Sequence, residues 1–241
     1  MIAVILAAGM ARRLRPLTDT MPKCLLKIGD KSLLQRSVDS LISCGINEFV
    51  VVTGYRSRMI TDFLKDNYTD KIFHFVDNDD YDTTNNIYSL WLAMPYVKGK
   101  DFLLLDSDIL YDSKLLDKVM EEECSALCVN RHELGDEEMK VVVDSNNVIT
   151  EISKTCSLHA AMGESVGVEK INADYSLALY DELEIMETQE NLVDIFYERA
   201  FERLIPKGYS FKVVDTTDIF STEIDTVEDY EMIRREWNAS K

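Results

Sequence analysis

The chain has 241 residues, 46% of them hydrophobic, which suits one large α/β domain with a full core. Its formal net charge of −18 argues against nucleic acid as the main partner, because phosphate backbones require a basic surface. No segment reaches the roughly 18 to 20 apolar residues that a membrane-spanning helix needs, so we expect no membrane insertion.

Strand and helix patterns alternate through the first half of the chain. We expect strands at residues 2–6, 49–53, 72–76 and 102–105. Between them we expect a helix that begins at Ser32, a short helix that contains residues 60–64, and a helix at 86–94. Ser32 and Gln35 form a capping box, and Gly45 is a stop signal for the first helix. Repeated strand–helix–strand units predict a parallel sheet with right-handed crossovers.

The second half has a different pattern. Segments 139–143 and 148–153 flank Ser145-Asn146-Asn147, which predicts a β-hairpin. We then expect a strand at 166–171, helices at 175–186 and 192–204, a strand at 211–214 and a closing helix at 226–237. Because no repeat or linker divides the chain, residues 1–241 are predicted to form a single domain. Its Rossmann-like, mixed but mostly parallel sheet would be flanked by helices, with the hairpin inserted in the second half.

A basic loop of small residues follows the first strand. Small side chains at Ala7, Ala8 and Gly9 let backbone N–H groups approach phosphate oxygens. The same loop carries four positive charges, on Arg12, Arg13, Arg15 and Lys23. The dinucleotide-binding G-x-G-x-x-G and the P-loop G-x-x-x-x-G-K-[ST] are both absent. Composition alone leaves two interpretations, an anion-binding loop or a basic surface loop.

The spacing of these residues resembles the signature of the nucleotidyltransferases that make nucleotide-activated sugars and alcohols. The similarity rests on Leu6-Ala7-Ala8-Gly9, Arg13-Leu14, Pro16, Thr18, Pro22 and Lys23. It implies the nucleotide-diphospho-sugar transferase fold and a nucleotide-binding loop made of Leu6, Ala7, Ala8, Gly9, Met10, Ala11 and Arg12. It also implies that Arg13 and Lys23 neutralise charge at the reacting phosphates. Ala11 stands where the family usually has glycine, so we expect the loop geometry to depart slightly there.

Two aspartates, Asp106 and Asp108, follow the strand at 102–105. Carboxylates beside a triphosphate suit Mg²⁺, which prefers oxygen ligands. The resemblance implies that Asp108 and Asp225 bind Mg²⁺ and that Asp106 lies at the nucleotide. Taken alone, Asp106 also suits the cap of a turn, and Asp225 equally suits the N-cap of the closing helix.

The segment Asn85-Asn86-Ile87-Tyr88-Ser89-Leu90 is similar to a segment of the bacterial CTP:phosphocholine cytidylyltransferases and their relatives. This similarity implies that Asn85, Asn86 and Ser89 contact the nucleotide. The residues themselves leave a second interpretation open, in which Asn85 only caps a helix.

Further segments, at 138–141, 151–154, 163–167 and 193–198, extend the same resemblance. They imply that Lys154 acts on the acceptor phosphate, and that the acceptor is bound by Glu138, Lys140, Glu164, Asp194, Phe196 and Tyr197. Aromatic faces and carboxylates suit a quaternary ammonium group. However, Met139 stands where a phosphocholine enzyme carries tryptophan. From the sequence alone, core packing of an amphipathic helix explains Phe196 and Tyr197 better than an acceptor contact does.

We therefore predict a cytidylyltransferase that transfers CMP from CTP to a small phosphorylated or phosphonate alcohol such as phosphocholine, with Mg²⁺ and release of pyrophosphate. Residues 1–110 would bind the nucleotide and 111–241 the acceptor. One alternative is a sugar-1-phosphate nucleotidyltransferase that uses UTP, dTTP or GTP. The other is a non-catalytic nucleotide-binding regulatory domain. Five scattered cysteines indicate free thiols in a reducing cytoplasm, and formation of a homodimer stays open.

Overall fold

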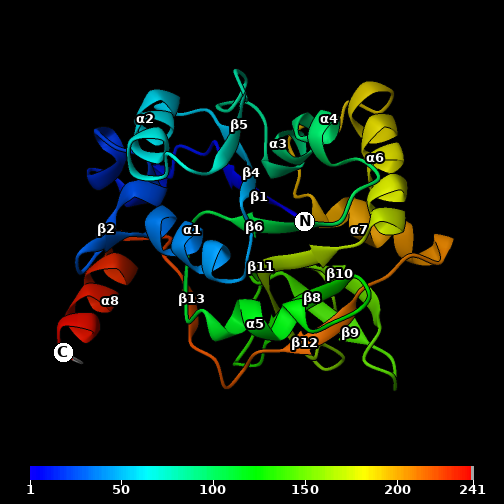
Figure 1. The fold of residues 1–241 in the computed structure, drawn as a ribbon. Coiled ribbons are helices and arrows are strands. Elements are labelled where there is room, and N and C mark those ends of the chain that lie inside the picture. Colours follow the sequence, from blue (N-terminus) through cyan, green and yellow to red (C-terminus); the bar gives the residue numbers. More distant parts are fainter. Residues whose placement is uncertain (240–241) are drawn as a thin grey trace.

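The central sheet combines a parallel part with an antiparallel part (Figure 1). The computed structural model describes residues 1–239, and within that range nine strands form the sheet in the order β10-β9-β11-β6-β1-β4-β5, with β8 pairing β11 and β12. These strands are β1 (Ile2–Ala7), β4 (Glu48–Thr53), β5 (Ile72–Asp77), β6 (Phe102–Asp106), β8 (Ala126–Asn130), β9 (Lys140–Val143), β10 (Ile149–Ser153), β11 (Gly163–Ile171) and β12 (Lys212–Asp215).

The parallel part comes from the first half of the chain. β1 pairs in parallel with both β4 and β6, and β4 pairs in parallel with β5. β11 then runs antiparallel to β6, β8 and β9, while the hairpin β9–β10 extends the sheet at the far side. The predicted mixed sheet with a hairpin in its second half is therefore confirmed. Because β1, β4 and β6 run in the same direction, their carboxyl ends meet at one edge, where open α/β sheets bind ligands.

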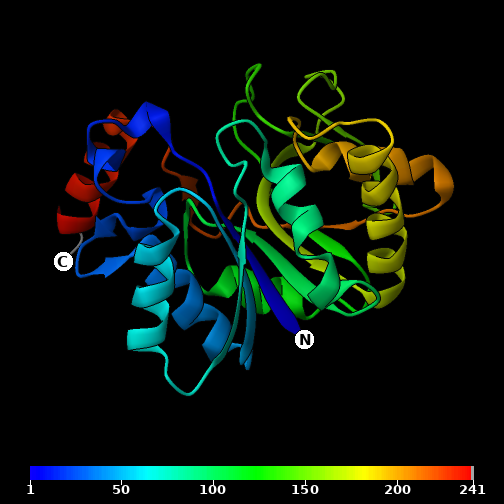
Figure 2. The ribbon, with the colours of Figure 1, turned by 90° about the horizontal axis from the view of Figure 1, so that it is seen from above.

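Helices cover both faces of the parallel strands, as Figure 2 shows from above. The helices are α1 (Leu33–Ser43), α2 (Ser57–Asn67), α3 (Asn86–Leu92), α4 (Met94–Val97), α5 (Lys114–Met120), α6 (Ala173–Thr188), α7 (Glu198–Leu204) and α8 (Val227–Ala239). Side chains alternate across β1, so Val4 packs toward α3 and α6, while Ile5 packs toward α1 and α2. Every residue of β1 is buried, which explains its continuous apolar sequence.

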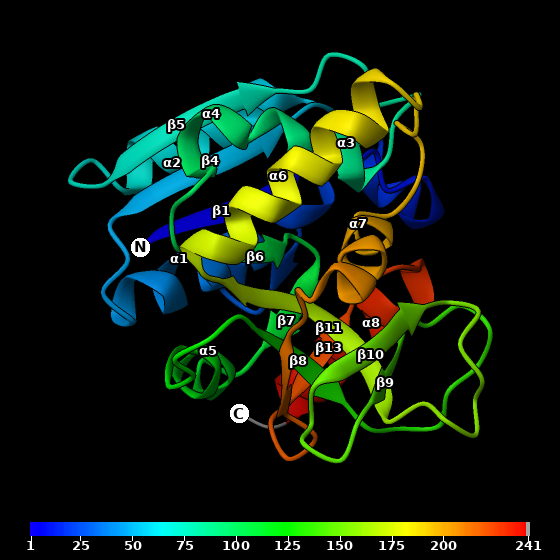
Figure 3. The same ribbon diagram turned by 90° about the vertical axis from the view of Figure 1, so that its right-hand side faces the viewer.

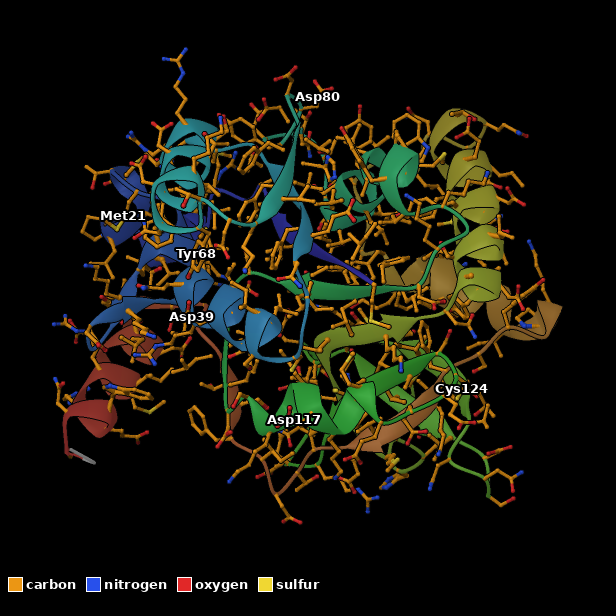
Figure 4. All side chains as sticks on the ribbon, in the orientation of Figure 1. Met21, Asp39, Tyr68, Asp80, Asp117 and Cys124 are labelled. Carbon is orange, nitrogen blue, oxygen red and sulfur yellow. The ribbon has the colours of Figure 1, made fainter. Side chains whose placement is uncertain are left out.

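Local signals in the sequence fix several ends of these elements. The Ser32 hydroxyl oxygen accepts a hydrogen bond from the Gln35 N–H, at 3.1 Å, which confirms the predicted cap of α1. Gly45 follows α1 with φ +85°, the left-handed conformation that suits glycine. α1 and α2 are joined by a hydrogen bond from the Tyr68 hydroxyl to Asp39, and Figure 4 marks both residues.

Several short elements were not predicted. They include α5, β8 and two small sheets, in which β2 (Lys27–Ile28) pairs β3 (Lys31–Ser32) and β7 (Ile109–Tyr111) pairs β13 (Ser221–Glu223). The pairing of β13 with β7 brings the segment before α8 to the end of β6. Two segments more than 100 residues apart in sequence thus meet at one place, which no local pattern indicates.

The predicted helix at 192–204 is wrong over its first part. α7 begins only at Glu198, because the preceding segment bonds to the start of α3 instead of to itself. The Asn85 N–H donates to the Val193 carbonyl at 2.9 Å, and the Tyr197 N–H donates to the Asn86 side-chain oxygen at 3.0 Å. Figure 3 shows α7 beside α6 and the hairpin β9–β10.

Across residues 1–239, none of the helices combines the length and the apolar character needed to span a membrane.

Candidate active site

A cavity of about 870 Å³ opens at the carboxyl ends of β1 and β6. Most residues that the sequence singled out lie in its lining. They are Leu6, Ala7, Ala8, Gly9, Ala11, Arg12, Arg13, Lys23, Asn85, Asn86, Ser89, Asp106, Asp108, Glu138, Lys154, Glu164, Phe196 and Asp225. Residues from both halves of the chain thus share one cavity.

The loop after β1 is held in place by its own backbone and by Tyr55. The Tyr55 N–H donates to the Ala8 carbonyl at 2.9 Å. The Ala11 carbonyl accepts from the Leu14 N–H at 3.0 Å and from the Thr18 hydroxyl at 2.9 Å. These bonds fold residues 12–14 into a short 3₁₀ turn and leave Gly9 in open space at the cavity.

Ala11 has a left-handed backbone, with φ 46° and ψ 56°. This is the conformation that a glycine adopts freely, and it costs an alanine about 1–2 kcal/mol. Alanine therefore occupies a glycine-like position in the loop, at the one residue where the sequence departs from the family pattern.

Four charged side chains form a chain of ion pairs at the floor of the cavity. The Lys23 ammonium lies 2.9 Å from Asp108 Oδ2 and 2.6 Å from Asp225 Oδ1. Arg13 Nη2 lies 2.5 Å from the other oxygen of Asp225. Burial acts to lower the pKa of Lys23, but the two carboxylates outweigh it and raise that pKa. Burial likewise acts to raise the pKa of Asp225, yet Lys23 and Arg13 hold it below its ordinary value.

Asp225 does not cap α8. Thr226 and Asp229 form that cap between them, since the Thr226 N–H donates to Asp229 Oδ2 at 2.8 Å and the Asp229 N–H donates to the Thr226 hydroxyl at 3.1 Å. The Asp225 carboxylate turns toward the loop after β1, so the capping interpretation left open by the sequence is removed.

The geometry fits a divalent cation between Asp108 and Asp225. Both carboxylates already converge on one cation, the Lys23 ammonium, and oxygen donors of this type suit Mg²⁺. Within residues 1–239 no cluster of three or more His, Cys, Asp or Glu side chains could hold a metal by itself. A bound Mg²⁺ would thus depend on phosphate oxygens and water for its remaining ligands.

Asp106 lines the cavity and belongs to an acidic cluster that extends from the cavity floor into the core. Its carboxylate accepts from the Tyr197 hydroxyl at 3.1 Å, and the same hydroxyl lies 3.4 Å from Glu169 Oε1. Burial, together with Asp108 and Glu198, raises the pKa of Asp106 well above its ordinary value. Gly167 makes the close approach possible, because a Cβ there would lie 2.8 Å from Asp106 Oδ2.

One end of the cavity carries amide and hydroxyl groups. Asn85 caps α3 through its side-chain oxygen, which accepts from the Asn86 N–H at 2.8 Å. Ser89 accepts from the buried side-chain amide of Asn78 at 3.1 Å, and that amide also donates to Thr84. The capping interpretation of Asn85 is therefore confirmed, and its side chain still lies in the cavity lining.

The other end carries mixed charges and one aromatic ring. The Lys154 ammonium lies 4.6 Å from the centre of the Phe196 ring and 3.5 Å from Glu137 Oε2. His132 Nε2 lies 2.7 Å from Glu164 Oε2. Phe196 is 41% exposed, so part of its side chain is accessible to a ligand, as the prediction of an acceptor contact requires.

Four predicted site residues lie outside the cavity lining. Lys140 is 1% exposed, and its ammonium donates to the carbonyls of Glu138 and Lys154, so it holds the two strands of the hairpin region together. Tyr197 is fully buried and acts on Asp106 from the core. Asp194 is exposed on the segment before α7, and Met10 is half-buried in the loop after β1. Burial therefore corrects the predicted direct acceptor contacts of Lys140 and Tyr197. The acceptor contact of Asp194 and the nucleotide contact of Met10 stay predictions.

Several cavity residues were missed. Glu198 is not one of them, because it ends the segment 193–198 that extends the resemblance; it lines the cavity, and burial raises its pKa to about 7. Asn78, Tyr81 and Thr84 belong to the turn between β5 and α3, and Gly167 sits at a bulge in β11. The cluster of polar residues at 77–84, directly after a predicted strand, could have indicated Asn78, Tyr81 and Thr84. Nothing in the local sequence indicates that Gly167 lies against Asp106.

Known proteins resemble this chain in sequence and in fold. A family model described as "MobA-like NTP transferase domain" matches residues 3–165. The chain is 28% identical to the CTP:phosphoglutamine cytidylyltransferase of Campylobacter jejuni over 255 residues, which covers 96% of this chain and 98% of the relative. It is 40% identical over 93 residues to the choline-phosphate cytidylyltransferase of Streptococcus pneumoniae, which covers 39% of each chain.

The fold is similar to that of a solved structure, the CTP:phosphocholine cytidylyltransferase from Streptococcus pneumoniae. The TM-score is 0.80 at 24% sequence identity, and the match covers 98% of both chains. This similarity confirms the predicted fold, a mixed sheet flanked by helices of the nucleotide-diphospho-sugar transferase type.

Proposed function

The chain belongs to the MobA-like NTP transferase domain family and is a nucleotidyltransferase, and from this premise we propose that it transfers CMP from CTP to a small phosphorylated acceptor. The observation that carries the proposal is the convergence of Asp108, Lys23 and Asp225 below the loop that follows β1. CTP is favoured as the nucleotide because both sequence relatives described above are named cytidylyltransferases, one for phosphoglutamine and one for choline phosphate.

We propose that residues 1–110 bind the nucleotide. Backbone N–H groups of the loop from Ala7 to Ala11 would bind the phosphates, and Arg12 and Arg13 would offset their charge. Asn85, Asn86 and Ser89 lie at the same end of the cavity and would orient the base and ribose. Asp106, at the floor, would lie beside the nucleotide phosphates and sugar.

Asp108 and Asp225 would hold Mg²⁺, which when bound would neutralise charge on the phosphates. Lys23 would serve the same electrostatic purpose with its own ammonium. Because Arg13 and Lys23 keep the pKa of Asp225 low, this carboxylate stays ionised and ready to bind a cation at neutral pH.

Residues 111–241 would bind the acceptor, which we propose to be a phosphorylated or phosphonate alcohol such as phosphocholine. Lys154 would bind its phosphate. Phe196, Glu138 and Glu164 would contact the remainder, and Glu198 adds a buried carboxyl group to the same region. An aromatic face with nearby carboxylates suits a cationic group on the acceptor.

In the proposed reaction an acceptor phosphate oxygen attacks the α-phosphorus of CTP in line. A new P–O bond forms as the bond from the α-phosphorus to the bridging oxygen breaks, and pyrophosphate leaves with that electron pair. Lys154 steadies the attacking phosphate, while Arg13 and Lys23 stabilise the charge that develops on the transferred group. No covalent intermediate with the protein is required.

A panel of nucleotides tests the proposal. Release of pyrophosphate is measured with CTP, UTP, dTTP and GTP, each with phosphocholine, ethanolamine phosphate, inositol phosphate and glucose-1-phosphate, in the presence of Mg²⁺. We expect turnover with CTP and phosphocholine, or with CTP and another phosphorylated alcohol. Turnover with UTP and glucose-1-phosphate, but none with CTP, would instead show the sugar-1-phosphate alternative. Nucleotide binding without turnover in any combination would show the regulatory alternative.

A further inference from the structure

A second cavity, of about 360 Å³, lies on the outer side of the turn between β5 and α3. The residues used below are Asp80 and Thr84 from that turn, Tyr88 and Trp91 from α3, and Glu187 and Thr188 from the end of α6. Figure 4 places Asp80 at the upper edge of the molecule, and Figure 3 shows α3 beside α6. Thr84 lines this cavity and the candidate active site, so the turn separates the two.

Glu187 is the unusual group in this cavity. The residue is only 6% exposed, and neither carboxyl oxygen has a hydrogen-bond partner among the described residues. A buried carboxylate without a partner is costly, and proteins almost always pair one. Burial accordingly raises the pKa of Glu187 to about 7.

Two aromatic rings form a wall of the same cavity. The Tyr88 and Trp91 ring centres lie 5.4 Å apart at an angle of 37°. The Trp91 indole N–H donates to Glu184 Oε2 at 3.0 Å, which fixes the orientation of its ring. Aromatic faces attract cations through the ring quadrupole, most strongly for tryptophan.

The charge around the cavity has one sign. Its lining carries Asp80 and Glu187 and, within the described residues, no lysine, arginine or histidine. Glu187 and Thr188 are also the last two residues of α6, and the C-terminal end of a helix favours a positive charge. A carboxylate, two aromatic faces and a helix C-terminus therefore all favour a cation at this place.

We propose that this second cavity binds a small organic ammonium ion, with its charged group on the Glu187 carboxylate and its alkyl groups against Tyr88 and Trp91. The aromatic wall and the volume favour an alkylated ammonium over a bare metal ion. Within residues 1–239 no cluster of three or more His, Cys, Asp or Glu side chains could hold such an ion. The site lies outside the candidate active site, and the inference does not depend on the proposed reaction.

Trp91 provides a direct readout of binding. The chain has two tryptophans, and the second, Trp237, lies on α8, so a Trp237→Phe background isolates the Trp91 fluorescence. The protein in this background is titrated with tetramethylammonium chloride, and separately with sodium chloride and with tert-butanol, a neutral compound of similar size. We expect a saturable change with tetramethylammonium that neither control reproduces.

Three variants locate the ligand. Glu187→Gln is expected to weaken tetramethylammonium binding at least tenfold, since it removes the charge and keeps the shape. Glu228→Gln makes the same change on an exposed residue of α8 and is expected to leave affinity unchanged. Phe196→Ala alters the candidate active site and is also expected to leave this affinity unchanged.

Equal binding by wild type and Glu187→Gln, a response without saturation, or an equal response to sodium chloride would each overturn the proposal. Should Glu187→Gln fail to fold, Tyr88→Leu takes its place, because Tyr88 is only partly buried and its loss removes one aromatic face. That variant is expected to bind severalfold more weakly, and unchanged affinity would equally overturn the proposal.

Discussion

At the scale of single residues, Asp108 has the clearest expected role. It shares the Lys23 ammonium with Asp225, and a Mg²⁺ ligand at this point would act directly on the phosphates. We expect Asp108→Asn to lower kcat at least about a hundredfold, the loss typical of removing one electrostatic group at a transition state. Circular dichroism should show a folded protein, and activity close to wild type would remove the metal assignment.

Ala11 carries backbone strain that a single change can relieve. Its φ of 46° is left-handed, and a glycine there adopts this conformation without cost from a Cβ. We expect Ala11→Gly to raise the free energy of unfolding by up to about 1 kcal/mol, because the relieved strain exceeds the entropy gained by the unfolded chain. Urea denaturation measures this free energy of unfolding, and a clear loss of stability in Ala11→Gly would contradict the left-handed loop geometry at Ala11.

Glu187 should make stability depend on pH. Its pKa rises from the ordinary 4.5 to about 7 in the folded protein, so the folded state holds a proton that the unfolded state has already released. Stability is therefore expected to fall as pH rises from about 4.5 to about 7 and to change little from this group above that.

The variant Glu187→Gln removes this dependence. The Tm of the variant relative to wild type should increase between pH 5 and pH 8, as measured by thermal melting in matched buffers. Glu228→Gln, on an exposed residue, should show no such trend. A constant Tm difference for Glu187→Gln across this range would contradict the raised pKa.

At the scale of elements, two adjacent residues at the start of α8 have different roles, one in helix capping and one in the candidate active site. Thr226 caps the helix, whereas Asp225 turns to Lys23 and Arg13. We expect Thr226→Ala to cost about 1 kcal/mol of stability with turnover largely kept. Asp225→Asn should instead lose turnover with a smaller change in helix stability. The reverse pattern, measured by urea unfolding and pyrophosphate release, would show that Asp225 is the cap.

The elements also show what the sequence could and could not predict. The parallel strands and their helices follow from alternating local patterns, and the position of the loop after β1 follows from them. The start of α7 could not be predicted from local patterns. The hydrogen bonds between Asn85 and Val193 and between Asn86 and Tyr197 join segments about 110 residues apart, and they override the local helix preference. Lys140 was predicted to bind the acceptor for a similar reason: its buried hydrogen bond to the Lys154 carbonyl depends on how the hairpin folds back, which the local sequence does not indicate.

At the scale of the whole molecule, the candidate site is assembled from both halves of the chain, so ligand binding should stabilise the entire fold. CTP with Mg²⁺ is expected to raise Tm in wild type, because a ligand that binds only the folded state shifts the unfolding equilibrium. The increase should be much smaller for Asp108→Asn. An equal increase in both proteins would place the nucleotide away from Asp108.

The identity of the product tests the central claim most directly. The protein is incubated with CTP, Mg²⁺ and a mixture of choline phosphate, ethanolamine phosphate, aminoethylphosphonate and inositol phosphate, and the products are identified by mass spectrometry. We predict pyrophosphate together with one CMP-linked product whose mass equals that of CMP joined to a single acceptor. Asp108→Asn should form this product at least about a hundredfold more slowly. Intact CTP with no CMP-linked product, while UTP and glucose-1-phosphate yield UDP-glucose under the same conditions, would contradict the account.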